Sequence, residues 1–171
     1  MVASVFVAAA LVSVHGPLQA APLAAAVPGM LAIARCDAAT HRIPNRLLAM
    51  TVIAFAVVAL GAEIAEVRGA RTALAMAGLW FGVLTLVHVL DPHLGPGDVK
   101  LGITLGLVLG WAAAVGGHGL AAAALTSAGA FVASCAATLI MESRSSASFV
   151  GTPFAPALVA ATLLAAVGLG V

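Results

Sequence analysis

Acidic side chains are the groups in this sequence whose type and placement could carry chemistry. The chain contains six of them: Asp37, Glu63, Glu66, Asp91, Asp98 and Glu142. We interpret the three glutamates as solvated loop residues and Asp91, which precedes a proline, as a turn or capping residue. Asp37 and Asp98 differ from these, because each lies where an apolar run meets a loop that contains proline or glycine.

Two carboxylates that meet in a partly desolvated site can share one proton, because two like charges in contact do not both stay ionised. The ionised carboxylate can take a proton from water, while the protonated one donates to a carbonyl oxygen. Aspartic proteases divide the work in this way, without a metal or a nucleophilic side chain. Asp37 and Asp98 are therefore the candidate acid–base pair of this chain.

Other chemistries find little support. The sequence has no HExxH and no GxSxG motif, and residues 95–100, GPGDVK, lack the spacing and ending of a Walker loop. Cys36 and Cys135 form no CxxC pair, so a structural zinc site is not indicated. His41 and His93 lie beside the two aspartates, and we interpret them as loop residues rather than ligands. We expect neither a metal nor a cofactor.

The elements that must position the aspartates follow from the composition. Of the 171 residues, 63% are hydrophobic and 8% are charged, against about 45–50% and 25% in soluble domains. Mean hydropathy is +1.19, and apolar runs of about 20 residues alternate with short polar breaks, which predicts an all-α, polytopic transmembrane helix bundle. A soluble enzyme, a disulfide scaffold and a disordered chain are excluded. The net charge of +1 gives no reason to expect a nucleic-acid partner.

The polar breaks divide the chain into about six membrane spans, at residues 18–36, 47–65, 72–90, 99–115, 120–141 and 152–171. The apolar run at 2–14 is short for a span, so we interpret residues 1–27 as an additional helix or half-helix. The chain, 1–171, is then a single membrane-embedded domain.

Positive charge orients such a bundle, because loops rich in Lys and Arg stay in the cytoplasm. If the spans alternate, one side carries two arginines, Arg68 and Arg71. The other side carries five basic residues: Arg35, Arg42, Arg46, Lys100 and Arg144. The excess predicts that the second side is cytoplasmic, and the alternation places both Asp37 and Asp98 on it.

Glycines at four-residue spacing predict close packing of two helices, because small residues let helix backbones approach in lipid. Gly102, Gly106 and Gly110 repeat in this way on the span after Asp98, and Gly78 and Gly82 do so on the preceding span.

Three short motifs occur in order along the chain. Asp37 is followed, after five residues, by Ile43-Pro44-Asn45; a GxGD motif, Gly95-Pro96-Gly97-Asp98, is followed by Lys100; and residues 151–156 read GTPFAP. Together they resemble the signatures of bacterial type IV prepilin peptidases, over residues 28–170. The third motif departs from the family's Pro-Phe-Gly-Pro-Phe, since Ala155 stands for Gly and Ala157 for Phe.

The resemblance implies an integral-membrane aspartyl endopeptidase that removes the basic leader of prepilins or pseudopilins at the cytoplasmic face, after a glycine. Asp37 and Asp98 would be its catalytic residues. Gly95 and Gly97 would permit the loop conformation that brings Asp98 towards Asp37, and Pro44 would fix the chain after the first site. The remaining supporting residues are Arg42, Ile43, Asn45, Lys100, Pro153, Phe154 and Pro156. Without CxxC motifs, the resemblance is to the short, peptidase-only form.

Three alternatives stay open. A presenilin-type GxGD protease would pair the motif with Tyr-Asp, but the chain has no tyrosine. A small proton-coupled transporter or channel subunit would use membrane-embedded aspartates as a proton relay, spread through the membrane depth. A non-catalytic scaffold would not need two aspartates in matched motifs.

Overall fold

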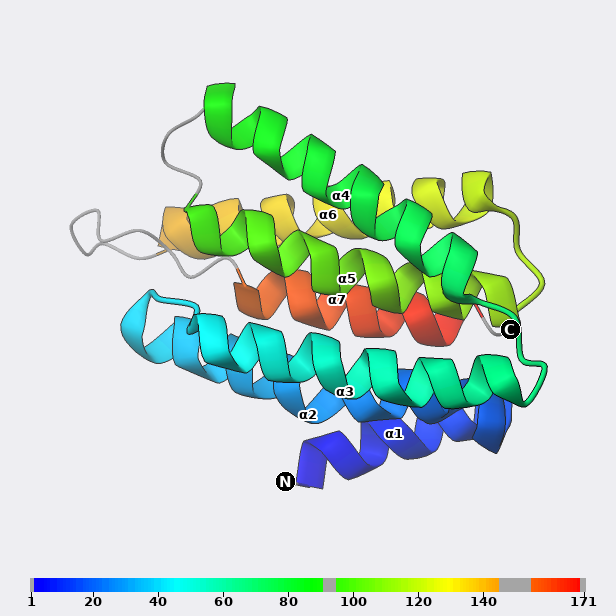
Figure 1. The fold of residues 1–171 in the computed structure, drawn as a ribbon. Helices are drawn as coiled ribbons and strands as arrows, with labels where there is room; N and C mark the ends of the chain where they lie inside the picture. The colour runs from blue at the N-terminus through cyan, green and yellow to red at the C-terminus, as the bar shows by residue number, and fades with distance from the viewer. Residues whose placement is uncertain (1, 91–94, 145–154, 170–171) are drawn as a thin grey trace.

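The computed structural model describes residues 2–90, 95–144 and 155–169, and within these ranges it contains seven α-helices and no strand (Figure 1). In chain order they are α1 (Val2–His15), α2 (Pro17–Thr40), α3 (Asn45–Ile64), α4 (Ala70–Leu90), α5 (Pro96–Val115), α6 (Leu120–Arg144) and α7 (Ala155–Gly168). The predicted all-α, polytopic helix bundle is confirmed.

Four helices are long and apolar enough to cross a membrane: α2, α3, α4 and α5. They coincide with the first four predicted spans. The last two predicted spans correspond to α6 and α7, in which the apolar helix covers Leu120–Ala133 and Ala155–Gly168 within the described residues. The breaks between the helices fall at the glycine- and proline-containing segments, because these residues interrupt helical hydrogen bonding.

The N-terminal segment forms the helix that the apolar run predicted. At 14 residues, α1 is about 21 Å long and is shorter than the roughly 30 Å hydrocarbon core. Gly16 has a φ of 81° and turns the chain from α1 into α2. Nε2 of the buried His15 lies 2.9 Å from the carbonyl oxygen of Ala166 on α7, within hydrogen-bonding distance. The first helix is therefore tied to the rest of the bundle.

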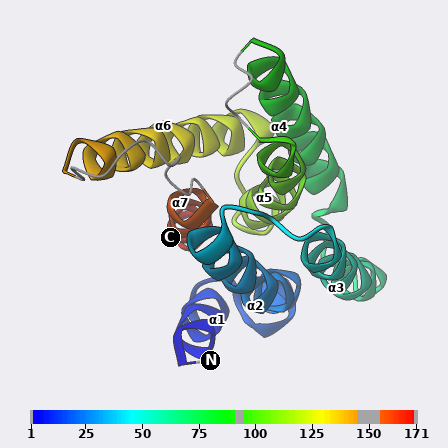
Figure 2. The same ribbon diagram turned by 90° about the vertical axis from the view of Figure 1, so that its left-hand side faces the viewer.

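Seen end-on, α7 lies at the centre of the bundle and contacts α1, α2, α5 and α6 (Figure 2). α5 is buried along most of its length, between α4 and α7, and its Trp111 is fully buried. The Nε1 of Trp111 donates a 2.9 Å hydrogen bond to the carbonyl oxygen of Gln19 on α2. These contacts make α5 and α7 the inner helices, against which the others pack.

Glycines bring α4 and α5 into backbone contact. A Cβ added at Gly106 would lie 2.6 Å from the Cα of Ala77, and one added at Gly110 would lie 2.5 Å from the carbonyl oxygen of Thr72. Any side chain at these positions would therefore push the two helices apart. The predicted close packing through Gly102, Gly106 and Gly110 is confirmed.

The prediction for the glycines of α4 is wrong. Gly78 and Gly82 lie on the exposed side of that helix, and an added Cβ at either would meet no atom within 4 Å. Buried Ala73 and Ala77 instead form the face of α4 that receives the glycines of α5. Four-residue spacing identifies residues that share a helix face, but not the face that finds a neighbour.

The helices alternate in direction, so their ends gather in two groups (Figure 1). The end of α2 and the starts of α3, α5 and α7 lie together at the left of the view. The α3–α4 connection, with Arg68, and the first turn of α4, with Arg71, lie at the opposite end of the bundle. This arrangement places the segments that carry Asp37 and Asp98 at the same end.

Candidate active site

Asp37 lies inside a helix rather than at the start of a loop, where the sequence had suggested that the span ended. α2 continues to Thr40, and His41 ends it in the left-handed conformation with a φ of 50° and a ψ of 34°. The N–H of His41 donates a 2.8 Å hydrogen bond to the carbonyl oxygen of Asp37. The helix therefore holds the Asp37 side chain in a buried position, 7% exposed.

Asp98 lies in the first turn of α5. Gly95 caps this helix in an extended conformation, Pro96 is its first residue, and the N–H of Asp98 donates a 3.0 Å hydrogen bond to the carbonyl oxygen of Gly95. Proline suits the first helical position because its missing N–H would have no partner there. The half-buried Asp98 is thus presented from a rigid helix start.

One cavity of about 350 Å³ brings the two carboxylates together. It is lined by Asp37, His41, Arg42, Ile43, Asn45, Gly95, Pro96, Gly97, Asp98 and Lys100. The charge of Asp37 acts on Asp98 across this space. The arrangement is therefore able to hold two interacting carboxylates around a water molecule and a polar substrate group.

A hydrogen bond joins the segments that carry the first two motifs. Nζ of Lys100 donates to Oδ1 of Asn45 at 3.0 Å, so the first residue of α3 is tied to α5. Lys100 and Arg42 bring two positive charges to a cavity that contains two carboxyl groups. The lining groups therefore balance in formal charge when both carboxyl groups are ionised.

A third segment reaches Asp37 through its backbone. The N–H of Ala155, the first residue of α7, donates a 3.0 Å hydrogen bond to Oδ2 of Asp37. Both residues are buried, and hydrogen bonds to ionised acceptors are stronger than those between neutral groups. The start of α7 therefore fixes the direction of the Asp37 carboxyl group.

Neither Gly95 nor Gly97 has a positive φ, so a left-handed backbone is not the reason for glycine at these two positions. Small size matters at Gly97. A Cβ added at Gly97 would lie 3.2 Å from the Cβ of Ile43, and one added at Gly95 would lie 3.4 Å from Oδ2 of Asp98. Gly97 therefore leaves room for Ile43, whereas the approach at Gly95 is an ordinary van der Waals contact.

The other predicted supporting residues do not line the cavity or lie outside the described residues. Pro44 caps α3 and is exposed, and Pro156 is half-buried in the first turn of α7. Neither is among the lining residues of the cavity. Pro153 and Phe154 lie outside the described residues, as does His93.

Two contributions to the site were missed by sequence reasoning. His41, interpreted as a loop residue, lines the cavity at the end of α2; its adjacency to Asp37 within one helical turn was the available signal. The Ala155 N–H had no signal of its own, because every residue except proline carries this donor. Within the described ranges, no group of three His, Cys, Asp or Glu side chains is placed to hold a metal ion.

Comparison with known proteins gives one result. A family model described as the type IV leader peptidase family matches residues 24–171, which include both aspartates and all three motifs. No curated protein and no solved structure matches the chain. The match agrees with the resemblance found in the motifs and covers most of the described helices. The chain belongs to the type IV leader peptidase family.

Proposed function

We propose that this protein is a membrane aspartyl endopeptidase that removes the basic leader of prepilin-like or pseudopilin precursors, with Asp37 and Asp98 as its catalytic pair. The observation that carries the proposal is the shared cavity of the two carboxyl groups at one end of the bundle. Membership in a peptidase family supports the same reaction class.

The reaction needs one ionised and one protonated carboxyl group. The ionised one takes a proton from a water molecule, and the resulting hydroxide attacks the scissile carbonyl carbon. The protonated one donates its proton to the carbonyl oxygen, which gives a neutral tetrahedral diol. Return of a proton to the amide nitrogen then breaks the C–N bond and leaves a carboxyl and an amine product. Asp37 and Asp98 act on the same water and carbonyl, so they must share one cavity.

The position of the cavity suits a substrate that is itself partly in the membrane. The site lies where α2 ends and α5 begins, both helices of membrane-spanning length. An apolar helix of the precursor can lie in lipid beside the bundle, while its unwound leader junction reaches the cavity. Unwound backbone at this depth requires polar partners, which the exposed Arg42, Asn45 and Lys100 can provide.

We assign the cavity to the cytoplasmic face because of the basic residues at that end of the bundle. Arg35, Arg42, Arg46 and Lys100 lie there, against Arg68 and Arg71 at the opposite end. The transporter alternative receives no comparable support, because the two carboxyl groups that share a cavity lie at one end rather than along a path.

The test is cleavage of a prepilin-like precursor by the purified, lipid-reconstituted protein. Asp37→Asn and Asp98→Asn should each lower kcat/KM by roughly 10²- to 10⁴-fold, because each removes one step of proton transfer. Glu66→Gln is the matched control, since Glu66 is an exposed carboxylate in the α3–α4 connection; it should cleave like the unaltered protein. Near-normal cleavage by either folded Asn variant would overturn the proposal.

A further inference from the structure

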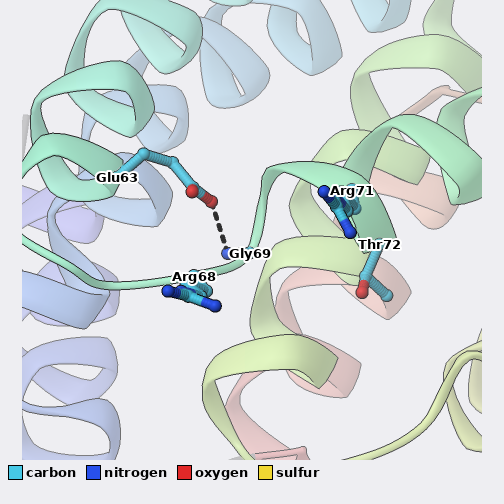
Figure 3. Close-up of a pocket in the computed structure, with 5 residues that line it drawn as sticks. All are labelled: Glu63, Arg68, Gly69, Arg71 and Thr72. Carbon is cyan, nitrogen blue, oxygen red and sulfur yellow. Dashed lines mark hydrogen bonds between the residues drawn. The ribbon is translucent and has the colours of Figure 1, made fainter.

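A second cavity, of about 500 Å³, lies at the end of the bundle opposite the two aspartates. It is formed where α3 ends and α4 begins, and it is lined by Glu63, Arg68, Gly69, Arg71 and Thr72 (Figure 3). Nothing in the proposed proteolysis uses these residues.

The backbone N–H groups at the junction of the α3–α4 connection and α4 already have a partner. Oε1 of Glu63 accepts hydrogen bonds from the N–H of Gly69 at 2.6 Å and from that of Ala70 at 2.7 Å. Glu63 belongs to the last turn of α3, so this carboxylate joins the two helices and fixes the shape of the connection. Any ligand of the cavity must therefore be held by other groups.

Two arginines give the cavity an excess of positive charge. Arg68 and Arg71 line it together with a single carboxylate, so the lining carries a net charge of +1. The Glu63 carboxylate is engaged by the N–H groups of Gly69 and Ala70, whereas Arg68 and Arg71 are both exposed. The guanidinium groups are therefore available to an anion.

The α3–α4 connection packs directly against a buried aromatic ring. A Cβ added at Gly69 would lie 2.7 Å from Cε3 of Trp111, so the backbone rests directly on the indole ring. Trp111 is fully buried and is itself held by the hydrogen bond from its Nε1 to the carbonyl oxygen of Gln19. A connection supported in this way keeps Arg68 and Arg71 at fixed positions along the backbone.

The position of the cavity relative to the bilayer indicates that its ligand is a lipid phosphate. α3 and α4 are both long and apolar enough to span the bilayer, so the connection between them lies at the membrane interface, where the lipid phosphates are. Guanidinium groups match the oxygens of a phosphate with their planar set of donors. The hydroxyl of Thr72 adds a further donor at the same cavity.

We propose that this cavity binds the phosphate of an anionic phospholipid headgroup, held by Arg68 and Arg71, in the leaflet opposite the Asp37–Asp98 cavity. The proposal is independent of the proteolytic function, since it requires only that the bundle is embedded in a bilayer. A lipid bound there would hold the α3–α4 connection through the two arginine side chains, in addition to the hydrogen bonds that Glu63 accepts from its backbone.

The test measures which lipids stay bound to the purified full-length protein, by native mass spectrometry from mixed micelles of phosphatidylglycerol and phosphatidylcholine. The unaltered protein should retain phosphatidylglycerol preferentially. The double variant Arg68→Gln, Arg71→Gln should lower its apparent affinity roughly tenfold or more, because two charge-assisted contacts are lost. The control Arg35→Gln, Arg46→Gln removes the same charge from exposed arginines at the other end of the bundle. It should bind phosphatidylglycerol as tightly as the unaltered protein does.

A single variant tests whether lipid binding becomes stronger when the positive charge of the cavity lining is increased. Glu63→Gln keeps an oxygen that can accept from Gly69 and Ala70 but raises the net charge of the lining to +2. It should therefore retain phosphatidylglycerol more strongly than the unaltered protein, which a purely structural role of the arginines does not predict. Weaker retention by folded Glu63→Gln would contradict the proposal.

Two other results would overturn the assignment. Equal losses in the Arg68/Arg71 and Arg35/Arg46 double variants would mean that the lipid responds only to overall charge. Inorganic phosphate, added in excess, should leave the bound phosphatidylglycerol in place because the headgroup is anchored by its acyl chains. Displacement of the lipid by phosphate would identify a free anion, rather than a lipid, as the ligand.

Discussion

The backbone N–H of Ala155 donates a hydrogen bond of 3.0 Å to the Oδ2 of Asp37, although the two residues are 118 positions apart in the chain. The contact joins the first residue of α7 to a buried residue near the end of α2. Ala155 belongs to the third motif of the sequence, residues 151–156. The motif therefore contributes to the site, because the start of α7 orients one of the two carboxyl groups proposed to act on water.

Removal of the Ala155 N–H should therefore impair cleavage. Ala155→Pro deletes the donor at the first position of α7, where proline is compatible with helix geometry. Loss of a hydrogen bond to a charged acceptor is worth about 1.5–3 kcal/mol, so kcat/KM should fall by roughly one to two powers of ten. The measurement is precursor cleavage by the reconstituted variant.

Ala155→Val is the matched control, because it adds comparable bulk at this fully buried position but keeps the N–H. It should cleave faster than Ala155→Pro at equal folded yield. If the two variants lose activity equally, bulk rather than the hydrogen bond is responsible, and the orienting role of α7 fails.

The Lys100–Asn45 hydrogen bond should couple the two halves of the site. Lys100→Met and Asn45→Ala each remove one partner of the 3.0 Å contact, and each should lower kcat/KM by roughly two- to tenfold, the effect of about 0.5–1.5 kcal/mol. The double variant should be little worse than either single variant, because the same contact is lost only once. If the losses of kcat/KM in the two single variants add up in the double variant, the two residues act separately.

Gly97 should tolerate no branched side chain, for a steric reason rather than a conformational one. An added Cβ would lie 3.2 Å from the Cβ of Ile43, so Gly97→Val should displace Ile43 or the start of α5 and slow cleavage strongly. Ile43→Ala in the same chain should restore part of the rate, since it removes the opposing atoms.

Gly82→Val is the control for this series, because an added Cβ at Gly82 meets no atom within 4 Å. It should cleave normally and reach the membrane in normal yield. Undiminished cleavage by Gly97→Val would refute the steric role of Gly97 without affecting the assignment of the two aspartates.

The α4–α5 contact should be sensitive to a side chain added on α5 and insensitive to one added at the exposed glycines of α4. Gly106→Val forces a side chain against the backbone of Ala77 and should destabilise the protein by about 1–3 kcal/mol or more. Gly78→Val, on the exposed face of α4, should change stability by only about 0.5 kcal/mol. Thermal unfolding in detergent compares the two, and similar losses would contradict the packing described for α5.

The sequence by itself determined the helices and the end at which the aspartates meet. Apolar runs separated by polar breaks predict the helices, since the bilayer demands internal hydrogen bonding and a minimum length, although α2 runs through Pro22 and Pro28 and ends only at Thr40. Alternating spans then place Asp37 and Asp98 at the same end, and the structure confirms this with a common cavity. Spacing also identified Gly102, Gly106 and Gly110 as a packing face.

Only the tertiary structure decided which surfaces and donors are used. Gly78 and Gly82 have the same spacing as the glycines of α5 but face outward, because a helix of this kind is apolar on every side and its pattern does not mark the inner face. Likewise, the hydrogen bond from Ala155 to Asp37 depends on how α7 docks against α2. Helix periodicity is a local property of the chain, whereas the partner of a face or of a backbone N–H is set by the docking of distant segments.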